Sequence, residues 1–189
     1  TWSMNGAPVE PEDRSGLFVF TPDSPLEPGD GILLSFSFKN RIPVGISKNG
    51  QPASEFVLPS GVVLTSFTPS FAPLPGFVEE VGLTKDNRPD AREYAPDFYQ
   101  GRTLPFVGAA NAFTTHIEIT VPSYMRANSV GVLTSVIDHE DTRTWIWDSD
   151  YPIRFYNIVA GEYAKREGSE GTAVYYHPEH AYNVDKILQ

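Results

Sequence analysis

Apolar and polar residues alternate along several short segments of the chain. In residues 113–121 the apolar side chains Ile117, Ile119 and Val121 fall at every second position, with polar side chains between them. Successive side chains of a β-strand point to opposite faces, so this period of two predicts a half-buried strand. Residues 32–39 alternate in the same way. Further strands are predicted at residues 16–20, which are typical of a buried strand, and at residues 62–67, 131–137, 143–147, 153–156 and 171–176.

Turn-forming residues separate these segments. The polar corner at residues 138–141 joins its two flanking strands into a hairpin, and residues 166–170 predict a turn before the last strand. Asn49-Gly50 predicts another turn, because both residues adopt the left-handed conformation easily. The strands of the second half follow one another at intervals of roughly 10–15 residues, which is typical of a sandwich. The pattern therefore predicts an all-β fold, an antiparallel β-sandwich.

Residues 69–105 depart from the strand pattern. Six prolines punctuate this stretch, and a charged run lies at its middle. A connection of this length is unusual inside a compact domain, so we expect a long ordered excursion over the surface. With this excursion included, residues 1–180 are predicted to form a single β-domain.

The C-terminal residues 181–189 are predicted to begin a helix. Apolar side chains recur there at the spacing of one helical face, and Pro178 and Glu179 suit a first turn. A helix of about two turns is marginal alone. We therefore expect the natural protein to continue, and this helix to belong to a following domain.

Composition and charge narrow the classes of protein. The 189 residues are enough to bury a core without metals or disulfides, and the 17 Pro and 15 Gly fall below the share typical of low-complexity chains. The absence of cysteine excludes disulfides, thiolate catalysis and cysteine-based zinc sites. A formal net charge of −10 argues against DNA and RNA as partners. No apolar run could cross a bilayer. The chain begins with Thr1 instead of an initiator Met and has no basic region followed by an apolar one, so we expect an internal or processed chain.

Trp145 and Trp147 lie two positions apart on a predicted strand and therefore share a face. Large rings stabilise a fold most when they are buried, so a core role is favoured. The alternative is a ligand-contact site in which the two rings stack on a sugar and Asp148 and Asp150 bind its hydroxyls. Under that alternative the chain is an independent carbohydrate- or solute-binding module.

Three patterns resemble metal sites, and each is incomplete. His177-Pro178-Glu179-His180 offers two imidazoles, but a proline separates them and no third ligand is near in sequence. Residues 139–143 begin like the zinc motif HExxH, but Arg143 stands where the second histidine belongs. The acidic corner at residues 138–141 could supply oxygen ligands to calcium, although solvated charges are usual in such a turn. We therefore expect no metal and no cofactor in this chain.

No catalytic apparatus is visible in the sequence. The serines lie in no G-x-S-x-G motif, the four histidines form no triad order, and glycine-rich nucleotide motifs are absent. A glycosidase carboxylate pair stays open, because only the distance between two carboxylates in space would reveal it. The sequence predicts that this chain is not an enzyme, with a glycoside-active enzyme as the third and weakest interpretation.

Several stretches resemble a known bacterial family. They are residues 26–30 (LEPGD), 32–38 (ILLSFSF) and 55–59 (EFVLP), and above all residues 173–188 (AVYYHPEHAYNVDKIL). In that family an ABC-2 type transporter permease is joined to an extracytoplasmic domain similar to zinc aminopeptidases of the aminopeptidase N group. The resemblance runs roughly from Gly16 to the C-terminus and is clearest in residues 113–188.

The resemblance implies a role for the chain as a whole. It is expected to be the non-catalytic N-terminal β-domain of a membrane-anchored protein, located outside the cytoplasm. Its partners would be the downstream peptidase-like domain of the same chain and a peptide substrate, whose N-terminal amine the acidic surface would favour. Zinc and the motif HExxH would lie in that downstream domain, so no ligand or catalytic base is carried over onto this chain. Contact with the membrane would come only through the parent protein.

Overall fold

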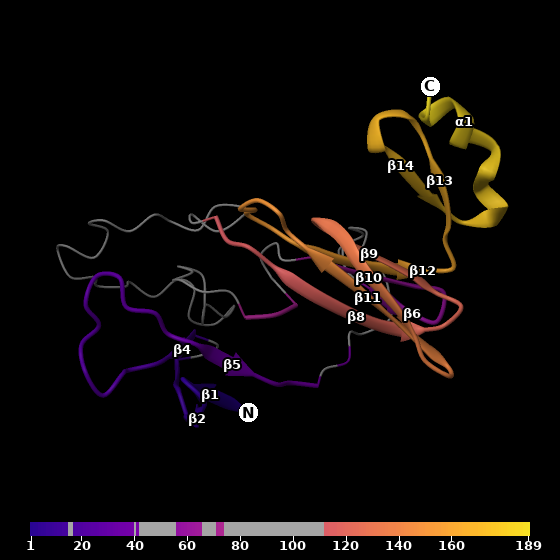
Figure 1. Ribbon diagram of the computed structural model, residues 1–189. Helices are drawn as coiled ribbons and strands as arrows, with labels where there is room; N and C mark the ends of the chain where they lie inside the picture. The colour runs from indigo at the N-terminus through magenta and orange to yellow at the C-terminus, as the bar shows by residue number, and fades with distance from the viewer. Residues whose placement is uncertain (15–16, 40, 42–55, 66–70, 74–111) are drawn as a thin grey trace, which may run out of the picture. The chain divides into compact units, whose positions relative to one another are not determined.

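The computed structural model describes residues 1–14, 17–39, 41, 56–65, 71–73 and 112–189 (Figure 1). These residues belong to two compact units, one formed by those up to Arg41 and the other by those from Phe56 onward. A division by contacts does not test whether the units fold separately, so the single domain over residues 1–180 stays a prediction. The predicted excursion at residues 69–105 lies outside the described residues except for residues 71–73, and the predicted turn at Asn49-Gly50 lies outside them entirely.

The N-terminal unit contains two small antiparallel sheets. A three-stranded sheet has the order β2-β1-β5, and β3 pairs with β4. The strands are β1 (Trp2–Met4), β2 (Ala7–Pro8), β3 (Glu12–Arg14), β4 (Leu17–Val19) and β5 (Leu34–Phe36). Asn5 and Gly6 turn β1 into β2 with positive φ angles of 51° and 84°, the conformation that an Asn-Gly hairpin requires.

Aromatic packing holds the N-terminal unit together. The ring centroid of Trp2 lies 5.1 Å from Phe18, 5.2 Å from Phe20 and 5.0 Å from Phe36. Trp2 lies on β1 and Phe36 on β5, whereas Phe18 lies on β4 and Phe20 follows directly after it. The ring of Trp2 therefore joins the two small sheets. Phe18 is nevertheless partly exposed, and the expectation that residues 16–20 form a buried strand is therefore wrong for its central residue.

The C-terminal unit contains three antiparallel sheets. Their orders are β10-β11-β8, β6-β7-β12-β9 and β13-β14. The strands are β6 (Phe56–Leu58), β7 (Gly61–Thr65), β8 (His116–Pro122), β9 (Arg126–Ser129), β10 (Val132–Asp138), β11 (Thr142–Asp148), β12 (Asn157–Gly161), β13 (Ala164–Glu167) and β14 (Ala173–Tyr176). All described pairings are antiparallel, so the predicted all-β, antiparallel class agrees with the structure.

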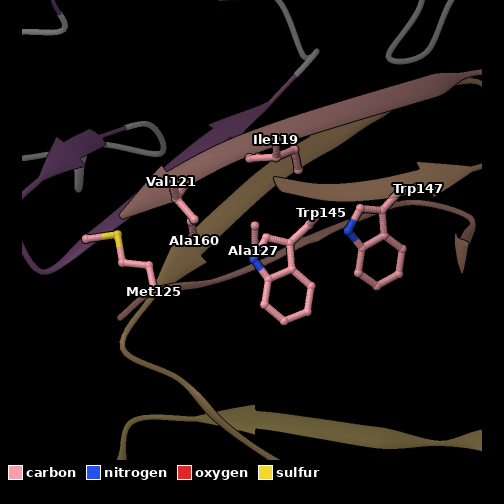
Figure 2. Close-up of a cluster of buried hydrophobic side chains, with 7 residues drawn as sticks. All are labelled: Ile119, Val121, Met125, Ala127, Trp145, Trp147 and Ala160. Atoms are coloured by element: carbon pink, nitrogen blue, oxygen red, sulfur yellow. The ribbon is translucent and has the colours of Figure 1, made fainter. Parts of the chain in front are cut away.

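One cluster of buried side chains joins the two larger sheets (Figure 2). Its members are Ile119 and Val121 from β8, Trp145 and Trp147 from β11, Met125, Ala127 from β9 and Ala160 from β12. Ala127 and Ala160 are directly opposite each other in the ladder between β9 and β12, and both are fully buried. Two methyl groups at this point leave room for the indole rings of the facing sheet.

The chain ends in short helical turns. A 3₁₀-helix, η2, spans Pro178–Asn183, and a single α-helical turn, α1, spans Val184–Ile187. The helix predicted at residues 181–189 is therefore present over residues 181–187, first as a 3₁₀-helix and from Val184 as an α-helix. Val184 is its one buried residue. An ion pair from Arg166 to Asp185 ties β13 to α1. No helix among the described residues is long and apolar enough to span a bilayer.

Most strands of the second half lie where the alternation predicted them, with two exceptions. Residues 153–156 form no strand, because Ile153 makes only an isolated bridge to Phe113 and the ladder starts at Asn157. The predicted turn at residues 166–170 begins later, since β13 continues to Glu167 and a 3₁₀ turn, η1, follows at Ser169–Gly171. The described structure also contains β9, whose polar sequence gave no strand signal.

Candidate functional site

A row of hydrogen-bonded polar side chains crosses the sheet β10-β11-β8. The Nδ1 atom of His116 lies 2.6 Å from Oδ1 of Asp148, and its Nε2 atom lies 3.2 Å from Oε1 of Glu118. The hydroxyl of Thr134 donates to Oδ2 of Asp148 at 2.8 Å. We call Glu118, His116, Asp148 and Thr134 the polar row.

The register of the sheet brings these four residues together. His116 on β8 stands directly opposite Asp148 on β11, and Glu118 shares their face because it follows His116 by two positions. On β10 the register shifts between Leu133 and Ser135. This bulge leaves Thr134 as the extra residue, and bulges commonly redirect a side chain in this way.

Hydrogen bonding raises the pKa of His116 above its ordinary value of 6.5. The bond to Asp148 is the largest cause, and the bond to Glu118 follows it. The same bond to His116, with help from Thr134, lowers the pKa of Asp148 below its ordinary value of 3.8. The polar row thus places the imidazole of His116 between two carboxylates on an exposed sheet face, where its protonated form is favoured.

The chemical capacity of the polar row is limited by its own contacts. General-base catalysis needs a ring nitrogen aimed at the proton to be removed, but both nitrogens of His116 face carboxylates. The hydroxyl of Thr134 donates to Asp148 and to the carbonyl oxygen of Ile146. Within the described part of the chain, no group of three or more His, Asp or Glu side chains is arranged to hold a metal ion.

The four residues predicted as ligand contacts do not share one face. Trp145 and Trp147 are 4% and 6% exposed and lie in the core, so the favoured core role is confirmed and the rings offer no platform for stacking on a sugar. Asp148 points to the opposite face of β11, where it bonds to His116. Asp150 follows the strand and is exposed. The period of two that places the rings together also places Asp148 away from them.

The two C-terminal histidines do lie close together. The ring centroids of His177 and His180 are 5.6 Å apart, and both side chains are exposed. Nδ1 of His177 already accepts a hydrogen bond from the backbone N–H of Glu179, as the N-cap of η2. His139, from the incomplete zinc motif, lies in the hairpin turn, and its Nε2 is 3.1 Å from the hydroxyl of Thr144.

Sequence reasoning missed the polar row. The alternation in residues 113–121 places His116 and Glu118 on the polar face of their strand, but nothing in the sequence links that strand to Asp148, 32 positions from His116. A prediction that aligned residues 113–121 against residues 143–148 in antiparallel register would have paired His116 with Asp148. Comparisons of the chain with protein-family models, curated proteins and solved structures gave no match.

The polar row should make stability depend on pH. His116 binds its proton more tightly in the folded state. Its contribution to the free energy of unfolding is therefore complete below pH 6.5 and disappears as the pH rises through the raised pKa of the folded protein. The contribution of Asp148 is complete above pH 3.8 and disappears as the pH falls through its lowered value. We expect the stability difference between the wild type and His116→Gln to be largest between these limits, and small because the pair is exposed.

Two measurements check this expectation. Urea unfolding of both proteins between pH 3 and pH 9 gives the stability difference, and NMR titration gives the pKa of His116 directly. In Asp148→Asn the pKa of His116 should fall toward its ordinary value, whereas Thr134→Val should change it less. A His116 pKa that is unaltered in Asp148→Asn would contradict the described geometry.

Proposed function

We propose that this chain is a non-catalytic β-domain that packs against a following peptidase-like domain of the same polypeptide. The proposal rests on one observation: the C-terminal segment carries large apolar side chains in water. Tyr182 is 80% exposed and Ile187 is 64% exposed. Both lie in residues 173–188, the stretch whose sequence most resembles the permease–aminopeptidase family.

This segment is suited to act as one half of an interface. It is anchored to its own unit through buried Val184 and through the ion pair between Arg166 and Asp185. Its outer side chains remain available, and full burial of each would contribute about 1.5–3 kcal/mol. Two large exposed side chains on one short, anchored segment support an interaction surface there.

The finer assignment follows the family resemblance. We propose that the two larger sheets form a β-sandwich like the N-terminal domain of aminopeptidase N enzymes, in a bacterial protein whose membrane anchor and zinc peptidase site lie in other parts of the chain. In this arrangement the domain stands outside the cytoplasm and walls one side of a peptide cleft. Its net charge of −10 would attract the N-terminal amine of a peptide.

A comparison of two proteins tests the proposal. One is the present chain, and the other is the full-length protein encoded by its gene. Tyr182→Ala should leave the melting temperature of the present chain within about 1 °C, but lower that of the full-length protein by several degrees, because the side chain is buried only there. Tyr151→Ala is the matched control, since Tyr151 is a similarly exposed tyrosine outside the segment.

Two results would overturn the proposal. One is a downstream sequence of about 150 residues, the length of a typical domain, that contains no HExxH motif. The other is hydrolysis of a leucine anilide by the purified present chain.

A further inference from the structure

The strand β10 is an edge that carries few of the features by which proteins protect edges. It is seven residues long and pairs only with β11 among the described strands. Edge strands are commonly protected by lysine, proline, short length or a β-bulge. The strand β10 is long and has neither lysine nor proline, although it does contain a bulge between Leu133 and Ser135. The opposite edge of the same sheet, β8, is protected by the charged pair His116 and Glu118 and ends at Pro122.

Apolar side chains line both faces of β10. Val132 is 51% exposed, Val136 42% and Ile137 43%. Val136 stands opposite Trp145, and Leu133 stands opposite Trp147, so these two continue the row of core side chains to the rim of the sheet. A further strand beside β10 could extend this row with an apolar residue at every second position.

Acidic residues lie at both ends of β10. The exposed hairpin corner at one end contains Glu140 and Asp141, together with Asp138, which is already paired with Arg143. At the other end Val132 stands opposite Asp148, which is bonded to His116, and exposed Asp150 lies two residues further on. Together with the net charge of −10, this distribution opposes a second copy of the chain and favours a cationic partner.

We propose that the outer edge of β10, which no other described strand pairs, binds an extended cationic peptide segment by strand addition. The segment carries apolar residues at alternate positions and Lys or Arg near its ends. Backbone hydrogen bonds to β10 supply the affinity, and the apolar row and the acidic ends supply the selectivity. The bulge between Leu133 and Ser135 interrupts the regular ladder near one end of β10. This role is separate from the interface at the C-terminal segment.

Fluorescence anisotropy of the present chain with a labelled peptide, Arg-Val-Thr-Val-Thr-Val-Lys, tests the proposal. We expect binding that weakens as salt is added. The same peptide, N-methylated at every internal residue, keeps its side chains but has no internal N–H group to donate from either edge, and should bind at least about tenfold more weakly. A peptide with Glu in place of both basic residues should also bind at least about tenfold more weakly.

Two variants locate the site on the protein. Val136→Lys should weaken binding about tenfold, because it places a protective lysine on the edge. Val57→Lys is the matched control, with the same charge change on β6, an edge of the other large sheet where Val57 is 43% exposed. Hydrogen exchange should show new protection in β10 and none in β8. If Val136→Lys fails to fold, the N-methylated peptide and the exchange data still decide the question.

Three results would overturn the proposal. The first is equal binding of the N-methylated peptide. The second is equal weakening by both lysine variants, which would indicate a general charge effect. The third is a dimer of the chain, seen by sedimentation and lost in Val136→Lys, which would assign the edge to a second copy.

Discussion

Trp145→Ala is expected to lower the free energy of unfolding of the C-terminal unit by about 3–5 kcal/mol. The indole is 4% exposed and lies at the centre of the cluster that joins the two larger sheets. Its loss would leave a cavity above Ala127 and Ala160, which are too small to fill it. The guanidinium carbons of Arg126 and Arg143, 5.2 Å and 5.9 Å from the ring centroid, would also lose their cation–π contacts.

The variant Trp145→Phe separates the effect of ring volume on stability from the cost of burying the Nε1 donor. The Nε1 atom of Trp145 is buried without a hydrogen-bond partner, and such a donor costs about 1–3 kcal/mol. Phenylalanine removes that donor while it keeps an aromatic ring, so we expect the free energy of unfolding to fall by less than about 1.5 kcal/mol. Urea unfolding followed by far-ultraviolet circular dichroism measures both variants. Equal losses in the alanine and phenylalanine variants would contradict the assigned role of ring volume.

Gly131→Ala is expected to destabilise the same unit by about 2–5 kcal/mol, the sum of backbone strain and steric displacement. Gly131 has a φ of +95°, which an L-residue rarely adopts. A Cβ atom there would overlap the carbonyl oxygen of Asp148 and stand 2.6 Å from its carbonyl carbon and 2.9 Å from the nitrogen of Ser149. The backbone at the end of β11 would have to move, and Asp148 would move with it.

Gly171→Ala is the matched control for Gly131→Ala. Gly171 also has a positive φ, +76°, but nothing lies within 4 Å of a Cβ at that position. Its substitution should therefore cost only the strain, about 1–2 kcal/mol. The His116 pKa, followed by NMR, should fall in Gly131→Ala and stay constant in Gly171→Ala. If the two variants lose equal stability, the close approach of Gly131 to Asp148 is not what requires glycine.

Local patterns predicted much of the C-terminal unit. Alternation in residues 113–121 predicted the inward face of β8 correctly, although the strand begins only at His116 and Phe113 makes an isolated bridge. The polar corner at residues 138–141 predicted the hairpin of β10 and β11. Side-chain size predicted that Trp145 and Trp147 are buried. These predictions succeeded because strand period and ring burial are local properties of a few neighbouring residues.

The strand β9 shows where local patterns fail. Its sequence, Arg-Ala-Asn-Ser, contains only one apolar residue, and strand propensity alone does not predict it. The strand forms because Ala127 packs against Ala160 beneath the tryptophans, and because the hydroxyl of Ser129 donates to the carbonyl oxygen of Asn157 at 2.6 Å. Both contacts join residues about 30 positions apart.

The sequence by itself determined the antiparallel β class, the inward faces of the main strands and the burial of the two tryptophans, since each depends on short-range periodicity and side-chain size. Only the tertiary structure decided that His116, Glu118, Asp148 and Thr134 form one hydrogen-bonded row. It also decided that β10 lies at an edge of its sheet among the described strands. Strand order and register join residues far apart in the chain, and a shift of one residue would move each side chain to the other face.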